Sequence, residues 1–108
     1  MDSQEYSKLA RRLIDRSLPA EQQMLNAALG LAGESGEIAD LVKKYHFHGH
    51  TNEVDKIVLE LGDLLWYVQQ MCYALNVTMH DVMIRNIDKL ERRYPNGFNY
   101  TDSLNRKD

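Results

Sequence analysis

Two pairs of acidic residues interrupt apolar stretches of this 108-residue sequence, and within each pair the acids lie three positions apart. Glu34 and Glu37 form the first pair, and Glu60 and Asp63 form the second. Carboxylate oxygens bind hard divalent cations, with Mg²⁺ first and Mn²⁺ as a common substitute. The two pairs therefore indicate a metal site, provided that all four side chains reach the same place.

Helical geometry predicts where these acids point. In a helix over residues 20–45, Glu37 lies about 60° around the helix axis from Glu34. The same side of this helix carries Ala27, Ile38, Leu41 and Tyr45. In a helix over residues 53–75, Asp63 lies about 60° from Glu60, on the side of Leu64, Tyr67 and Met71. Both acidic pairs thus belong to apolar stripes that are expected to face inward.

Four carboxylates gathered between two such helices repel one another, so either some of them are protonated or cations lie between them. A single pair of this kind is common on a solvated helix surface, and it can also be a salt-bridged pair in a core. Two pairs on consecutive helices, both on the apolar side, favour the metal site.

The elements that carry these acids are predicted by apolar periodicity, which indicates an all-α fold without strands. Helices are expected at about residues 3–15, 20–45, 53–75 and 78–94.

Local signals mark the ends of these helices. Ser3 and either Thr51 or Asn52 are candidate N-caps, and Thr78 with Asp81 forms a variant capping box. Because proline disfavours helical geometry in the residue before it, Pro95 ends the last helix, and the tail from about residue 95 is expected to be irregular.

The length suits one domain over residues 1–108. The expected helix over residues 53–75 is apolar around most of its circumference, and three neighbouring helices of so small a chain can barely cover it. We therefore expect a four-helix bundle that is completed by dimerisation.

Composition excludes several classes of partner. The net charge of −3 argues against a nucleic-acid-binding face. No stretch is apolar for long enough to span a membrane, and the N-terminal residues contain no apolar segment of signal-peptide length. Cys72 is the single cysteine, so no intramolecular disulfide can form, and a reducing, cytoplasmic location is expected.

Three glycines, Gly30, Gly33 and Gly36, accompany the first acidic pair, although each costs about 1 kcal/mol relative to alanine inside a helix. Positions without side chains let another helix or a ligand approach the backbone beside the acids. Close helix packing alone is the alternative explanation.

Four segments, GLAGESGEIADLVKK, FHGH, ELGDLLWYV and NIDKLERRYPNGF, resemble the all-α nucleoside triphosphate pyrophosphatases, the MazG-like family. The similarity extends over residues 20–100. It implies a small helical bundle that assembles as a homodimer or a dimer of dimers. It also implies Mg²⁺-dependent hydrolysis of a (deoxy)nucleoside triphosphate between the α and β phosphates, which yields a monophosphate and pyrophosphate in nucleotide-pool house-cleaning or pool shaping.

The resemblance also assigns roles to single residues. It makes Glu34, Glu37, Glu60 and Asp63 the metal ligands, and Glu34 or Glu37 is expected to take the proton of the attacking water. On the last long helix, three residues share one stripe: Asn86, Lys89 and Arg93. Lys89 and Arg93 are expected to contact the phosphates, with Asn86 as hydrogen-bonding support. A solvated basic face is the alternative, but the family-like spacing N-x-x-K-L-x-x-R favours phosphate contact.

Two further residues are candidates for substrate binding. Lys44 shares the helix face of Glu37, seven residues further on, and is a phosphate candidate. Tyr67 follows Asp63 by one turn, so its hydroxyl can reach a metal ligand or the sugar, although a core tyrosine is the alternative.

Two other classes of protein could carry acids inside a helical bundle. A non-catalytic helical dimerisation or nucleotide-sensing module is the main alternative, but a scaffold has no reason to bury four like charges. Di-iron carboxylate proteins use Glu-x-x-His motifs, whereas the second position of each pair here is an acid, Glu37 or Asp63.

Overall fold

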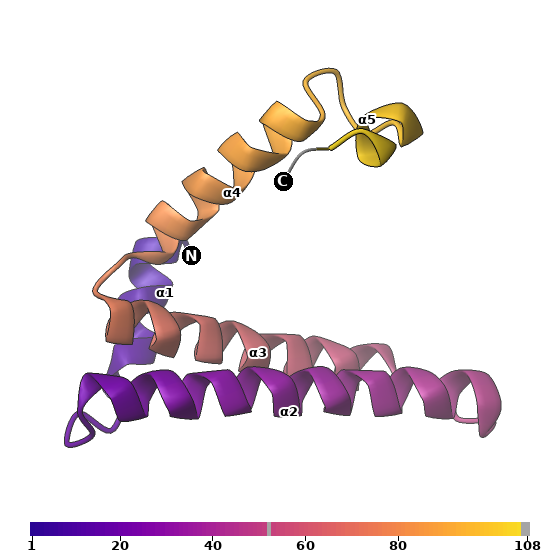
Figure 1. Ribbon diagram of the computed structural model, residues 1–108. Coiled ribbons are helices and arrows are strands. Elements are labelled where there is room, and N and C mark those ends of the chain that lie inside the picture. Colours follow the sequence, from indigo (N-terminus) through magenta and orange to yellow (C-terminus); the bar gives the residue numbers. More distant parts are fainter. Residues whose placement is uncertain (52, 107–108) are drawn as a thin grey trace.

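The computed structural model describes residues 1–51 and 53–106. Two long helices, α2 (Ala20–Phe47) and α3 (Val54–Leu75), run antiparallel side by side and form the body of the chain (Figure 1). Both predicted helices are confirmed to within two residues at each end. The N-cap of α3 is Glu53 instead of Thr51, and Asn52, the other predicted cap, lies outside the described residues.

The first helix is shorter than predicted. α1 (Ser3–Ala10) gives way to a single 3₁₀ turn, η1 (Arg11–Leu13), whereas periodicity predicts one helix through residue 15. Its N-cap is Asp2 instead of Ser3, because the Asp2 carboxylate accepts a hydrogen bond from the Glu5 backbone N–H at 2.9 Å. Trp66 of α3 donates its indole N–H to the Ala10 carbonyl at 3.2 Å and so ties the end of α1 to α3.

The core between the helices contains amide side chains as well as apolar ones. Gln70 of α3 donates to Gln23 of α2 at 2.7 Å, and Asn26 of α2 donates to Gln70 at 2.8 Å. Gln23 and Gln70 are buried, next to buried apolar residues that include Ala27 and Cys72. We call Gln23, Asn26 and Gln70 the amide cluster; because hydrogen bonds are directional, it fixes the axial position of α2 against α3.

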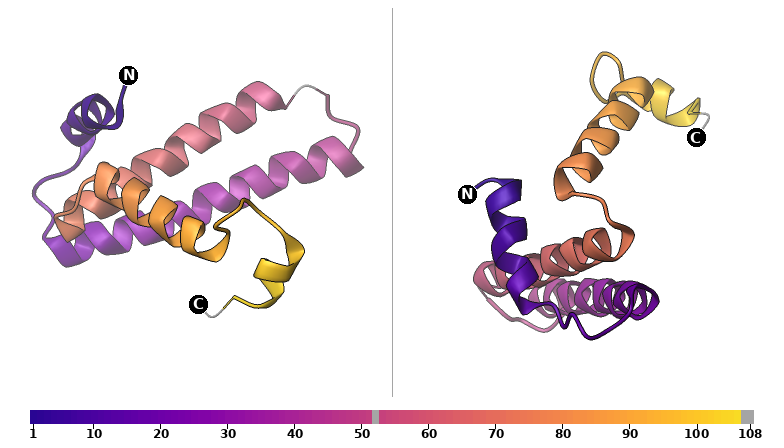
Figure 2. Two further views of the ribbon diagram at one scale, coloured as in Figure 1. Left: turned by 90° about the horizontal axis from the view of Figure 1, so that it is seen from above. Right: turned by 90° about the vertical axis from the view of Figure 1, so that its left-hand side faces the viewer.

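α4 (Met79–Arg93) begins with the predicted capping box. The Asp81 N–H donates to Thr78 Oγ1 at 2.9 Å, and the Thr78 N–H donates to the Asp81 carboxylate at 3.1 Å. α4 then rises away from the α2–α3 pair, as Figures 1 and 2 show. Met79, in its first turn, is its only buried residue.

A short fifth helix, α5 (Tyr100–Leu104), follows in the tail that was expected to be irregular. Asn99 caps α5, because its side-chain oxygen accepts a hydrogen bond from the Asp102 N–H at 2.7 Å. A local cap of this kind stabilises one turn of helix without a hydrophobic stripe.

Large apolar surfaces stay uncovered within the chain. On α3, the exposed fractions of Val58, Leu59 and Leu61 are 58%, 70% and 51%. In the described ranges, the chain is therefore a helix pair with two projecting segments, α1 and α4, and it does not close a four-helix bundle by itself (Figure 2). No helix in these ranges combines the length and the hydropathy of a membrane span.

Candidate metal and phosphate site

α2 and α3 approach each other closely at Gly30, which faces the ring of Tyr67. A Cβ at position 30 would overlap that ring, so the contact requires glycine. Gly33 and Gly36, further along α2, have no neighbouring atom within 4 Å of where a Cβ would lie. Gly30 therefore permits close helix packing, whereas Gly33 and Gly36 leave open space beside the acids.

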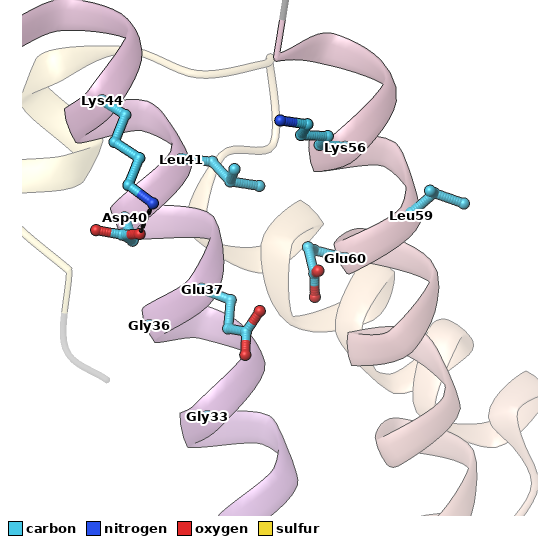
Figure 3. Close-up of a pocket in the computed structure, with 9 residues that line it drawn as sticks. All are labelled: Gly33, Gly36, Glu37, Asp40, Leu41, Lys44, Lys56, Leu59 and Glu60. Atoms are coloured by element: carbon cyan, nitrogen blue, oxygen red, sulfur yellow. Dashed lines mark ion pairs between the residues drawn. The ribbon is translucent and has the colours of Figure 1, made fainter. Parts of the chain in front are cut away.

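Three of the four predicted acids converge next to this helix contact. Glu34, Glu37 and Glu60, which we call the acid cluster, each offer a carboxylate oxygen, and these oxygens lie within 4.8 Å of one another. Figure 3 shows Glu37 on α2 and Glu60 on α3 facing each other across the gap between the helices. Asp63 lies outside this group, but its charge acts on Glu34.

Interactions within the acid cluster strongly shift the pKa of Glu34. A hydrogen bond with Glu60 is the largest cause that raises the pKa of Glu34 from 4.5 to about 7, followed by desolvation and by repulsion from Glu60, Asp63 and Glu37. The cluster is therefore partly protonated near neutral pH when no cation is bound. This outcome is one of the two that the sequence left open for gathered carboxylates.

The donor set fits a divalent cation. Oε2 of Glu34 is buried and has no hydrogen-bond partner within the described ranges. A buried oxygen without a donor is costly, and a bound cation would satisfy it. Because every ligand atom on offer is a carboxylate oxygen, the cluster suits a hard divalent ion.

Two lysines line a cavity of about 530 Å³ that adjoins Glu37 and Glu60. Lys44 of α2 lies with its Nζ 2.9 Å from Asp40 Oδ2, and this ion pair raises the pKa of Lys44, which keeps it charged. Lys56 of α3 is a lining residue that the sequence reasoning missed. Its spacing in the sequence indicates this position, because Lys56 precedes Glu60 by four residues and so shares its helix face.

The structure places the remaining predicted residues elsewhere. The Tyr67 ring packs against Gly30 and does not line the cavity. Asn86, Lys89 and Arg93 lie on α4, which leaves the helix pair, and none of them lines the cavity either. One chain therefore brings three of the four predicted acids close to Lys44, without the predicted stripe of α4.

Fold and site together define a class of protein: all-α chains with an acidic cluster and adjacent lysines, suited to a divalent cation and a phosphate-bearing ligand. The chain belongs to the MazG family, since its residues 22–98 match the MazG nucleotide pyrophosphohydrolase domain. The matched range contains every residue assigned above to metal or substrate.

Among curated proteins, the chain is similar to the Gene 37 protein of Mycobacterium phage L5, with 42% identity over 73 residues. The aligned region covers 64% of this chain and 64% of that protein, which is less than two thirds of the relative's length. No solved structure gives a significant match.

Proposed function

We propose that this chain is a nucleoside triphosphate pyrophosphohydrolase that cleaves between the α and β phosphates. The products are a nucleoside monophosphate and pyrophosphate. The acid cluster supports this activity most directly, because it combines three convergent carboxylates, a buried oxygen without a donor and an adjacent cavity lined by lysines. The match to the MazG nucleotide pyrophosphohydrolase domain agrees with it.

Glu34, Glu37 and Glu60, together with Asp63, are the proposed ligands of Mg²⁺, with Mn²⁺ as a substitute. When bound, such an ion lowers the pKa of water and neutralises phosphate charge. Glu34 or Glu37 accepts a proton from the attacking water as general base.

Cations of the chain hold the charged substrate. Lys44 and Lys56 lie on opposite walls of the cavity and bind the phosphate oxygens (Figure 3). Lys89 and Arg93 are further phosphate contacts, with Asn86 as hydrogen-bonding support, and the Tyr67 hydroxyl is a candidate partner of a metal ligand or of the sugar. Positioning the substrate and neutralising its charge account for most of the catalysis of phosphoryl transfer.

The proposal includes an oligomeric state and a cellular location. The uncovered apolar faces of α3 and α4 favour a homodimer or a dimer of dimers. A cytoplasmic, house-cleaning or pool-shaping role suits an enzyme that removes nucleoside triphosphates.

Product analysis tests the proposed activity. The purified chain is incubated with each of the eight common nucleoside triphosphates and with dUTP, in Mg²⁺ or in EDTA, and phosphorus NMR identifies the products. We expect monophosphate and pyrophosphate in Mg²⁺ and no turnover in EDTA. Diphosphate and inorganic phosphate as products contradict the proposed cleavage site, and nucleotide binding without turnover supports the sensing module instead.

A further inference from the structure

A second cavity lies between α1 and the start of α4, which are neighbours in the fold (Figure 1). We call it the α1–α4 cavity; its volume is about 510 Å³, and Arg11 of η1 also lines it. Among the described residues, it shares no lining residue with the cavity beside Glu37 and Glu60. Ser7 of its wall bonds Gln69, which lies nine residues beyond Glu60, about 14 Å along α3. The two cavities are therefore separate.

The lining of the α1–α4 cavity is cationic. Lys8, Arg11 and His80 line it, and no aspartate or glutamate does so within the described ranges. Asp81 is in the first turn of α4, but its carboxylate accepts the hydrogen bond of the Thr78 N–H in the capping box. Within the same ranges, neither Lys8 nor Arg11 forms an ion pair with an acid. Two fixed positive charges thus meet at this cavity without a counterion from the described chain.

Hydrogen-bond donors at the wall of this cavity also lack acceptors. Nε of Arg11 is buried and has no hydrogen-bond partner in the part of the chain that the structure describes. Behind Ser7, the side chain of Gln69 is 1% exposed, and its Nε2 is a second buried donor without a described partner. Buried donors of this kind cost free energy when they stay unpaired. This region of the chain therefore has more donors than acceptors, which favours an anionic ligand.

The donor set suits a phosphate group. A guanidinium offers five N–H donors and an ammonium offers three, and the hydroxyls of Ser3 and Thr78 also line the cavity. A phosphate group carries close to two negative charges at neutral pH and has three strong acceptor oxygens, so it can bind several such donors at once. The volume of the cavity lies within the range of small-molecule sites, so there is room for a group attached to the phosphate.

We propose that the α1–α4 cavity is a second anion site, which binds a small phosphate-bearing ligand between Lys8 and Arg11 on one side and Thr78 and His80 on the other. A ligand bound there bridges α1 and the first turn of α4, where Met79 is the only buried residue of that helix. It therefore stabilises the direction in which α4 leaves the α2–α3 pair. This inference does not depend on the proposed function, because it uses none of the residues assigned to metal or substrate.

Calorimetric titration of the whole chain in EDTA tests this site. Inorganic phosphate, pyrophosphate and AMP are titrated separately at one ionic strength, and we expect saturable binding. Arg11→Gln and Lys8→Gln should each weaken it about 10- to 100-fold, as expected for the loss of one charge-assisted hydrogen bond. Lys8 is exposed, so its replacement keeps the test valid if Arg11→Gln fails to fold. Tighter binding of AMP than of phosphate identifies a phosphate ester as the ligand, and the reverse order identifies a free anion.

Two control variants assign the binding to one cavity. Arg12→Gln removes the neighbouring cation, which is exposed and does not line the α1–α4 cavity. Lys56→Gln removes a cation from the cavity beside the acid cluster. Both variants should keep the wild-type affinity for the anion. The inference is wrong if none of the three anions binds, if Arg11→Gln and Arg12→Gln weaken binding equally, or if Lys56→Gln alone abolishes it.

Hydrogen exchange locates the bound anion independently. The anion that binds most tightly should slow amide exchange in residues 3–11 and 78–82 and leave residues 33–44 unchanged. Protection confined to residues 33–44 overturns the inference. Neither measurement involves turnover, so a wild-type chain that releases no pyrophosphate contradicts the proposed function alone.

Discussion

The α2–α3 pair and α4 position their charged side chains in different ways. In the pair, the contact of Gly30 with Tyr67 and the amide cluster hold two helices together, so the carboxylates of Glu34 and Glu60 meet within one chain. α4 is amphipathic, yet Met79 in its first turn is its only buried residue, and the helix rises away from the pair (Figure 1). The comparison indicates that one chain suffices to build the acid cluster, whereas it leaves the apolar surface of α4 uncovered.

Removal of one carboxylate is the largest change that we predict. Glu37→Gln or Asp63→Asn is expected to lower kcat by more than about 100-fold, the upper end of what loss of an outer-shell partner costs. The far-UV circular dichroism should stay unchanged, because the amide cluster and the Gly30 contact hold the helices. Glu21→Gln, an exposed site in the first turn of α2, serves as the control. Near-wild-type turnover in Glu37→Gln contradicts the metal-ligand assignment.

Two glycine variants test whether the helix pair is held by its closest contact. Gly30→Ala places a methyl group against the Tyr67 ring, whereas Gly33→Ala meets open space. Both gain about 1 kcal/mol of helix propensity, which cancels in the comparison. Gly30→Ala should therefore unfold more easily than Gly33→Ala by about 1–3 kcal/mol, the usual cost of overpacking. Urea unfolding of both variants measures this difference, and equal stabilities would show that the contact is not tight.

A substitution on α4 is expected to act on association instead. Ile87→Ala removes apolar area from the exposed stripe, and a lost contact of about 1.5–3 kcal/mol raises the dissociation constant of the assembly about 10- to 100-fold. Asp88→Ala, on the other side of α4, is the control. Sedimentation velocity over a dilution series measures both constants. An unchanged dissociation constant in Ile87→Ala places the association surface elsewhere.

The smallest predicted effect concerns pH and the metal-free chain. Because the folded pKa of Glu34 is about 7 and its ordinary value is 4.5, the folded state binds more protons between these values. Stability is therefore greatest at the acidic end of that window and falls as pH rises towards 7. We expect the Tm in EDTA to drop by a few degrees from pH 5.5 to pH 8, with a smaller drop in Glu34→Gln.

Added Mg²⁺ gives the complementary measurement to this titration. Binding requires the carboxylates to be ionised, so Mg²⁺ should raise the Tm more at pH 8 than at pH 5.5. Thermal scans at both pH values provide the comparison. An equal rise in Tm at the two pH values would show that Mg²⁺ does not bind at the acid cluster.

Local patterns in the sequence predict most of the helix pair. The bounds of α2 and α3 follow from long apolar periodicity, and the capping box at Thr78 is a local hydrogen-bond pattern. The convergence of Glu34, Glu37 and Glu60 follows from helical phase once the two helices are antiparallel. The helix bounds and the capping box depend on residues a few positions apart, whereas the convergence of the acids also depends on the packing of α2 against α3.

Features that depend on distant contacts escaped prediction. α1 ends at Ala10, whose carbonyl bonds Trp66, a residue far away in the sequence. The direction of α4 relative to the pair depends on a few contacts around Met79, for which no periodic pattern exists. Of the three glycines, only Gly30 meets a neighbour, and its partner Tyr67 cannot be identified from spacing alone.

The amide cluster affects the spacing of the carboxylates, although it lies away from them. Gln70 lies ten residues from Glu60, about 15 Å along α3, and it does not line the cavity beside the acid cluster. Apolar surfaces can slide past one another, but the bonds that Gln70 shares with Gln23 and Asn26 hold the two helices at one offset. Mutational screens for altered metal preference should therefore recover changes at these remote amides, because a shift of one helix along the other changes every oxygen-to-oxygen spacing at once.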